Sequence, residues 1–173
     1  MPGLGVDAEL RWAILRRLTA TGRADDAEID AELERDATDA GARHATACRA
    51  AIPDAEHKAA AWHLLAETEE LGVLSAAEAS RGFIQAEHAS LLAPYVERYF
   101  QALPRIWSSR GEHIRVQLSQ LLFPHPATSP ILLARVDAFL AVGHDPGLTR
   151  VLAEKRDIVA RALRSRALPA LPG

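Results

Sequence analysis

The sequence predicts an all-α protein in which about nine antiparallel helices stack as HEAT- or armadillo-like helical hairpins, an α-α superhelix. Alanine, the strongest helix former, is abundant, and apolar residues recur at helical spacing in segment after segment, with no convincing strand between them. Most segments begin at a capping residue and end at Gly or Pro. The first segments pair into units of roughly forty residues, the length of HEAT and armadillo repeats, without a strict repeat signature; a compact irregular bundle is the alternative.

The first two helices are expected on either side of Gly22, which supplies a stop. Asp7 can cap a helix that runs to about Ala20, and the acidic stretch DDAEIDAELERD follows. Early acidic residues in that stretch suit the positive end of a helix dipole, and its apolar stripe is Ile29 and Leu33. The apolar residues of the first helix are Leu10, Ile14 and Leu18 on one face, with Trp12 and Leu15 alongside.

Three more helices are expected before the middle of the chain. Thr38 or Asp39 can open an Ala-rich helix, and Pro53 breaks the chain after it. Another helix follows this break. Ser75 and Glu78 have the spacing of a capping box for the third. The apolar residues of the last two helices are Trp62, Leu64 and Leu65, then Phe83 and Ile84.

The clearest helix lies near the middle of the chain. Pro94 stands where a first-turn proline is tolerated. Pro104 falls inside the pattern and predicts a kink, because its ring removes one backbone hydrogen bond and clashes with the preceding turn. Gly111 ends the helix. Its apolar positions follow the i, i+3, i+4 rule and are Leu92, Tyr95, Val96, Tyr99, Phe100, Leu103, Ile106 and Trp107.

Three helices are expected in the remainder. Two prolines stop the first, Ser129 with Pro130 starts the second, Gly143 closes it, and Asp145 with Pro146 starts the last. The apolar positions are Ile114, Leu118, Leu121 and Leu122 in the first, Leu132, Val136, Phe139 and Leu140 in the second, and Leu148, Leu152, Val159 and Leu163 in the third.

Length and composition indicate a single helical domain, residues 1–173, with residues 168–173 expected as a frayed tail. The formal net charge of −3 gives no general attraction for nucleic acid or an acidic membrane, and no apolar run approaches the length of a membrane span. The single cysteine excludes an internal disulfide, and the N-terminus lacks the pattern of a secretory signal. A cytoplasmic setting is therefore expected.

The seven histidines do not fall into a catalytic or metal-binding spacing. A helical zinc peptidase needs H-E-x-x-H, in which two histidines bind the metal and the Glu activates water. Here Glu precedes His at three places, none followed by a second His at the required offset. His57 and His63 are six positions apart and lie on different helix faces. No catalytic residue or metal ligand is therefore expected. The three Glu-His pairs are Glu56-His57, Glu87-His88 and Glu112-His113.

Other candidate groups have structural explanations. Cys48 lies among alanines, which favours a small buried side chain over a nucleophile. Asp25 and Asp26 favour a solvated acidic face over an acid–base pair. The aromatic stripe of the middle helix favours core packing over a ligand platform. Cations of the last helix suit its dipole, with a nucleic-acid patch as the alternative, and are Arg150, Lys155, Arg156, Arg161, Arg164 and Arg166.

Three segments carry a family resemblance: DAELRWAILRRLTATGR, ERDATDAGARHATACRAAIPDAEHKAAAWHLL and LLAPYVERYFQALPRIW. They resemble the C-terminal helical domain of actinobacterial aminopeptidase N, a zinc aminopeptidase of the gluzincin type related to endoplasmic-reticulum and puromycin-sensitive enzymes. The middle segment is the most typical, with Ala-Ile-Pro-Asp followed by Lys58 and Trp62. The resemblance runs from Val6 to Leu163, nearly the whole chain.

The resemblance implies a non-catalytic domain that caps the catalytic domain of the same polypeptide and encloses the chamber that holds a peptide. In that family an earlier domain carries the H-E-x-x-H zinc site and the G-x-M-E-N motif that grips the substrate's amino group, and this sequence has neither. The parent enzyme is thus expected to hold zinc and remove N-terminal amino acids, while this chain alone has no cofactor and no activity. No substrate-contacting residue can be assigned, and an exposed domain interface gives a route to a dimer.

Two other classes stay open at this point. The first is a free-standing HEAT-like module that binds a protein partner. The second is a HEAT-like DNA-binding repair protein, which would need a basic concave face; the weakly negative net charge argues against it.

Overall fold

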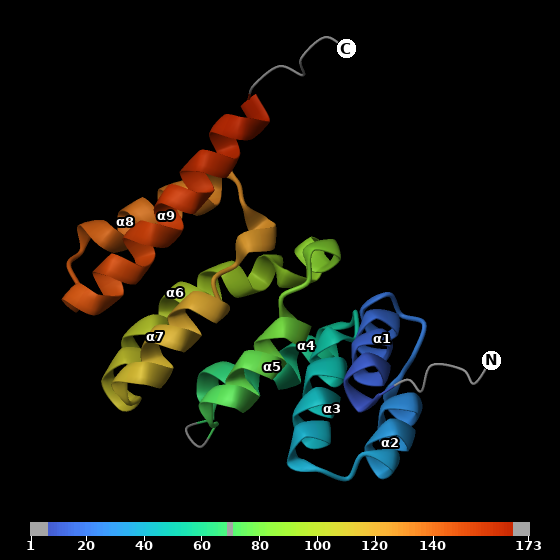
Figure 1. Ribbon diagram of the computed structural model, residues 1–173. Helices are drawn as coiled ribbons and strands as arrows, with labels where there is room; N and C mark the ends of the chain where they lie inside the picture. Colours follow the sequence, from blue (N-terminus) through green and yellow to red (C-terminus); the bar gives the residue numbers. More distant parts are fainter. Residues whose placement is uncertain (1–6, 69–70, 168–173) are drawn as a thin grey trace. The chain divides into compact units, whose positions relative to one another are not determined.

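The computed structural model describes residues 7–68 and 71–167, and within these ranges the chain is helical without a strand. Nine α-helices, one π-helical turn and two 3-10 turns follow one another in this part of the chain (Figure 1). The all-α prediction is therefore confirmed. The tail predicted at 168–173 lies outside the described residues. None of the described helices is long and apolar enough to cross a membrane.

The chain divides into two compact units, Met1–Leu91 and Leu92–Gly173, which are described separately. The first unit contains seven helical elements, which are α1 (Ala8–Ala20), α2 (Asp26–Arg35), α3 (Asp39–Ala51), α4 (Ala55–Trp62), a π-helical turn (His63–Glu67), α5 (Val73–Phe83) and a 3-10 turn (Ala86–His88).

Short polar side chains fix where the first four helices begin. Asp7, Thr38 and Asp54 each accept a hydrogen bond from the backbone N–H three residues on, at 2.8, 3.0 and 2.9 Å. Asp25 forms a full capping box with Glu28 at the start of α2. These contacts satisfy N–H groups that the first helical turn leaves without a carbonyl partner. The sequence analysis thus places α1 and α3 correctly.

The capping box predicted at Ser75 and Glu78 is wrong. Helix α5 begins two residues earlier, at Val73, with Gly72 in the capping position and no side-chain cap. Ser75 therefore lies inside the first turn of α5. A residue inside the helix cannot serve as its N-cap, and Glu78 lies 3.6 Å from Arg16 of α1 and 3.9 Å from His44 of α3 instead.

Helices α1, α3 and α5 run in the same direction, side by side. His44 of α3 lies 3.3 Å from Glu9 near the start of α1 and 3.9 Å from Glu78 of α5, and its ring stacks on that of Trp12 at 5.8 Å. Further along, Leu15 of α1 packs in one cluster with Cys48 of α3. Helices α2 and α4 connect these parallel helices. The stacking of hairpins in the HEAT or armadillo manner stays a prediction.

The apolar face predicted for α1 is only partly the buried one. Trp12 and Leu15 are buried, and Trp12 Nε1 donates to Asp36 Oδ2 at 2.8 Å. Leu10 and Ile14, by contrast, are 49% and 48% exposed. The helix has a broad apolar arc, and α3 covers the part of it that contains the tryptophan. Of the apolar residues predicted for this helix, the buried ones are thus Trp12 and Leu15 rather than Leu10 and Ile14.

Helices α3 and α5 touch so closely that one position between them has room only for glycine. A Cβ added to Gly82 would lie 1.9 Å from the carbonyl oxygen of Ala47 and 3.0 Å from Cβ of Ala50. The small side chains of Ala76 and Ala79, both fully buried, extend this contact along α5. Alanine abundance in this sequence thus allows close helix packing as well as favouring helix formation.

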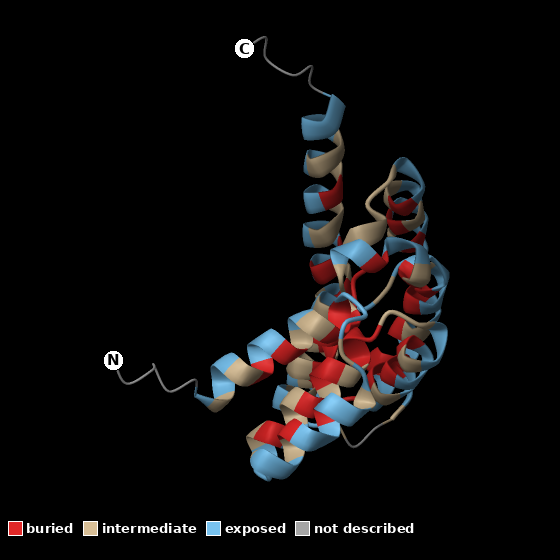
Figure 2. Cartoon of the chain, turned by 90° about the vertical axis from the view of Figure 1, so that its right-hand side faces the viewer, coloured by how far each residue is buried: buried red, intermediate tan, exposed pale blue. Residues whose placement is uncertain are grey.

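The second unit contains α6 (Ala89–Ser109) from Leu92 onward, α7 (Glu112–Leu121), a 3-10 turn (His125–Ala127), α8 (Pro130–Ala141) and α9 (Pro146–Ala167). Its core is aromatic. Tyr99 meets Phe100 and Phe123 edge to face at 5.2 and 5.7 Å, and Phe100 lies 5.5 Å from Phe139 of α8. The aromatic stripe of the middle helix is therefore core, as predicted. Figure 2 shows the same division throughout, with buried residues where helices meet and exposed ones on their outer sides.

One of the two prolines of α6 lies at a different position in the helix from the one predicted. The helix begins at Ala89, so Pro94 lies in its second turn rather than its first. Pro104 lies inside α6 as predicted, and the helix continues beyond it to Ser109. Both positions lack the N–H that an α-helix uses. The Ser129 cap and the Gly143 turn, at a φ of 83°, agree with the sequence analysis.

Gly82→Ala is expected to destabilise the protein by about 2 kcal/mol or more, because the methyl group must push α5 away from the backbone of α3. Chemical denaturation followed by circular dichroism measures the loss. Gly72→Ala is the matched control on the same helix, since nothing lies within 4 Å of its added methyl group. An equal, small effect of both substitutions would show that α3 and α5 are not in tight contact.

Candidate functional site

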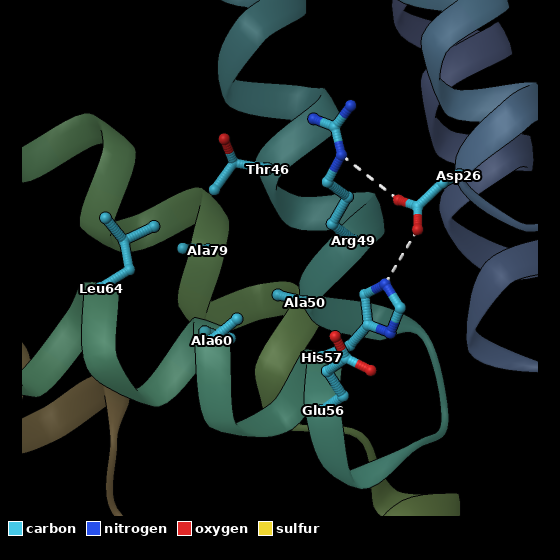
Figure 3. Close-up of a pocket in the computed structure, with 10 residues that line it drawn as sticks. Asp26, Thr46, Arg49, Ala50, Glu56, His57, Ala60, Leu64 and Ala79 are labelled. Atoms are coloured by element: carbon cyan, nitrogen blue, oxygen red, sulfur yellow. Dashed lines mark hydrogen bonds and ion pairs between the residues drawn. The ribbon is translucent and has the colours of Figure 1, made fainter.

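A groove of about 420 Å³ lies between α3 and α4 in the first unit and is called here the α3–α4 groove. Alanines from α3, α4 and α5 form its floor and walls, and charged side chains stand at one end of it (Figure 3). The lining residues are Asp26, Thr46, Arg49, Ala50, Glu56, His57, Ala60, Ala61, Leu64 and Ala79.

His57 bridges two carboxylates at the charged end of the groove. Its Nδ1 lies 2.7 Å from Asp54 and its Nε2 lies 3.0 Å from Asp26, which also contacts Arg49 at 3.3 Å (Figure 3). Carboxylates only accept hydrogen bonds, so the charged ring, which carries protons on both nitrogens, can donate to both of them. Burial opposes this charge, but the hydrogen bonds to Asp26 and Asp54 outweigh it and raise the pKa of His57. The bridge ties the start of α4 to the start of α2.

Lys58, the next residue, lies fully buried on the other side of α4. Its Nζ donates to the carbonyl oxygens of Ala50 at 2.6 Å, Phe83 at 3.2 Å and Gly82 at 3.5 Å. These carbonyls belong to the last turns of α3 and α5, which have no further N–H to bind them. Burial lowers the pKa of Lys58 to about 8 despite the carboxylates of Asp54 and Glu87. One ammonium group therefore closes two helix ends.

The other histidines lie apart from one another. The buried His88 donates from Nε2 to the carbonyl oxygen of Ala20 at 2.8 Å, and burial lowers its pKa. His63 lies 2.8 Å from Glu67 on the π-helical turn. Nowhere in residues 7–68 and 71–167 do three His, Cys, Asp or Glu side chains gather around a position that fits a metal ion.

Cys48 is fully buried in the core with Trp12, and burial raises its pKa to about 12. A thiol held in this protonated form is a poor nucleophile, which agrees with the structural interpretation of this residue. Asp25 and Asp26 serve as cap and bridge at the start of α2.

The cations of α9 are largely occupied within the second unit. Arg156 pairs with Asp137 of α8, and Arg150 lies 3.3 Å from Glu154. Lys155 Nζ lies 3.3 Å from Nε2 of His125, and Arg166 donates to the carbonyl oxygen of Thr128 at 2.9 Å. This pairing fits intramolecular roles better than a phosphate-binding surface.

Sequence reasoning missed the His57 bridge and the Lys58 contacts. The spacing Asp54–His57 is the one clue, because an N-cap aspartate lies beside the residue three positions on. Asp26 is far away in the sequence, and nothing local indicates that it meets His57. The buried position of Lys58 was equally hidden, since a lysine on an Ala-rich helix ordinarily faces solvent.

Comparison with known proteins identifies the family. The model of the ERAP1-like C-terminal domain matches residues 1–161, and the chain belongs to this family. It is similar to aminopeptidase N of Streptomyces lividans, with 43% identity over 169 residues that make up 97% of this chain and 20% of that protein. The chain thus spans about a fifth of the length of this relative. The resemblance to aminopeptidase N noted in the sequence is confirmed.

Lys58→Met is expected to change how the stability of the protein depends on pH, because Lys58 is a buried charge. Below about pH 8 the folded protein holds Lys58 charged at the full cost of burial. Between pH 8 and 10.5 the folded state gives up this proton while the unfolded chain keeps it, so the wild type gains stability relative to the variant as pH rises. The gain is about 3 kcal/mol across the window, measured by urea unfolding of both proteins.

Taking the difference between the two proteins removes the contributions of Cys48 and the tyrosines, which both contain. A difference that stays constant from pH 7 to pH 10.5 would contradict a desolvated Lys58.

His57 is expected to titrate above 6.5 in the folded protein, and Asp26→Asn is expected to lower its pKa by removing one of the two carboxylates. The raised pKa means that the bridge stabilises the fold fully below pH 6.5 and loses this contribution as pH rises through the pKa of folded His57. Ring-proton NMR measures the titration. His88 is the internal control, because its pKa is lowered. Titration of His57 below that of His88 would rule out the bridge.

Proposed function

We propose that this chain is the non-catalytic C-terminal domain of a zinc-dependent aminopeptidase N, in which it caps the catalytic domain of the same polypeptide and helps to enclose the chamber that holds the peptide. The observation that carries the proposal is the relationship to aminopeptidase N along almost the whole chain. The whole protein would remove N-terminal amino acids from peptides. Residues 1–173 would act as one cytoplasmic domain.

The motifs of the sequence support a non-catalytic role for this chain within a larger enzyme. The sequence contains neither H-E-x-x-H nor G-x-M-E-N, so the zinc ion and the recognition of the substrate's amino group are assigned to other residues of the polypeptide. Helices α1, α3 and α5, joined by α2 and α4, would form a wall of the chamber, and a wall needs no catalytic residues. Closing a chamber limits the size of the substrate and keeps bulk water from the reaction.

The alternative of a free-standing HEAT-like module is not favoured. A separate interaction protein has no reason to match nearly all of its length to one segment of a much longer enzyme. Binding of nucleic acid is also not favoured, because the net charge is −3 and four of the six cations of α9 have partners within the second unit.

A segment exchange tests the proposal. The matched segment of Streptomyces lividans aminopeptidase N is replaced by this chain, and the hydrolysis of a dipeptide and of a decapeptide is measured. We expect the exchanged protein to cleave both substrates. Deletion of the segment is expected to change the ratio of kcat/KM for the two lengths by about tenfold, because an open chamber discriminates poorly by size.

The isolated chain is the second arm of this test, and we expect it to bind no stoichiometric zinc and to show no turnover. Zinc binding with peptide cleavage by the chain alone would overturn the assignment. So would an unchanged length preference after deletion of the segment.

A further inference from the structure

A second groove, of about 280 Å³, lies between α1 and α2 on the side of α1 away from its tryptophan, and is called here the α1–α2 groove. Leu10 stands beside it on the same side of α1. Aliphatic residues and charged residues line the groove in equal number. Its lining residues are Arg11, Ile14, Leu15, Leu18, Glu28, Ala31, Glu32 and Arg35.

The apolar surface of α1 is too wide for the neighbours that cover it. Successive residues of an α-helix are about 100° apart, so Leu10, Ile14 and Leu18 follow one another at steps of about 40°. This row continues directly into the buried face that contains Leu15 and Trp12. The buried part of the arc contacts α3, whereas Leu10 and Ile14 are each about half exposed. A helix that carried only one buried face would not need aliphatic residues at these two positions.

The charges around the groove are balanced among themselves. Glu32 accepts hydrogen bonds from Arg11 Nε at 2.7 Å and from Arg35 Nη1 at 3.2 Å, and Glu28 adds a second carboxylate. Two arginines and two glutamates leave no formal net charge. An apolar segment with an uncharged contact row therefore fits the groove better than an acidic or a basic one.

The groove is suited to an occupant tethered by its own polypeptide. It holds only a few aliphatic side chains, far less surface than the ~1,000 Å² that separate molecules bury in a stable interface. A tethered segment is present at an effective concentration of order millimolar, so a small apolar contact is enough to hold it. The relative aminopeptidase N extends far beyond the matched fifth of its length, which supplies the chain for such a segment.

We propose that a helix of the same polypeptide, from outside residues 1–173, packs its row of aliphatic side chains into the α1–α2 groove and covers Leu10 and Ile14. This inference rests on the proposed function, since it needs a longer polypeptide. The contact repeats the way in which α1 itself packs on α3, where Trp12 and Leu15 meet the small Ala45 and Cys48. In the groove the small residue is Ala31 of α2.

Thiol labelling tests this contact in the segment-exchanged aminopeptidase. Ile14→Cys is labelled with a maleimide in that protein and in the isolated chain. We expect labelling about tenfold slower, or more, in the exchanged protein, because thiol reactivity follows exposure. Ile131→Cys is the matched control: Ile131 is an aliphatic residue of α8 that is 81% exposed. Its labelling rate should be the same in both proteins. The native Cys48 is buried and adds no fast background.

The outcomes separate this inference from the proposed function. Slow labelling of Ile14→Cys in an exchanged protein that lacks activity supports the covered groove and counts against the function. Equal labelling rates in an active exchanged protein overturn the covered groove alone. Protection that appears in the isolated chain as its concentration rises, together with dimers in light scattering, overturns the tethered helix in favour of a second copy.

Failure of the exchanged protein to fold does not leave the inference untested. The same cysteine is then placed in Streptomyces lividans aminopeptidase N at the position that aligns with Ile14, with its control at the position that aligns with Ile131. Slow labelling at the first position and fast labelling at the second supports a covered groove. Fast labelling at both overturns it.

Discussion

The close contact between α3 and α5 is the constraint on which the first unit depends. Gly82 lies against the backbone of Ala47, so the two helices approach to the limit that backbone atoms allow. Such an approach brings the last carbonyl groups of both helices into the interior, where no water can reach them and a missing hydrogen bond is costly. Lys58 supplies the missing donors to both helix ends with one ammonium group. The close packing of α3 and α5 therefore depends on the buried lysine, which binds the carbonyl groups that this packing removes from water.

The position of Lys58 also determines where α4 can place its other residues. With Lys58 pointing inward, the preceding His57 lies toward α2, where its contacts with Asp26 and Asp54 favour the charged form of the ring. Ala60 and Ala61, one turn further on, line the α3–α4 groove, and their small size is what keeps this groove open. The perturbed groups of this region thus follow from the need to close helix ends. Perturbed pKa values often mark catalytic sites, but structural charge networks perturb them as well.

Much of this fold could be predicted from sequence because its signals are local. Asp7, Thr38 and Ser129 begin helices where capping residues are expected, and the aromatic row of α6 is buried as its spacing indicates. The failures are contacts between residues far apart in the chain. The spacing of Ser75 and Glu78 predicts a capping box, yet α5 begins at Val73 and Glu78 lies near Arg16 and His44 of other helices. The bridge of His57 to Asp26 and the carbonyl partners of Lys58 depend on which helices lie side by side, and periodicity within one helix carries no information about that.

The error at α1 is of another kind, because the pattern was right and its interpretation was incomplete. Leu10, Ile14 and Leu18 do form an apolar row, but the row extends a face that α3 already covers in part. Periodicity reports that a surface is apolar and does not say whether the covering element lies inside or outside the sequence at hand. A helix that packs on two neighbours carries two apolar faces, so the row of Leu10, Ile14 and Leu18 is what the proposed contact with a further helix would require.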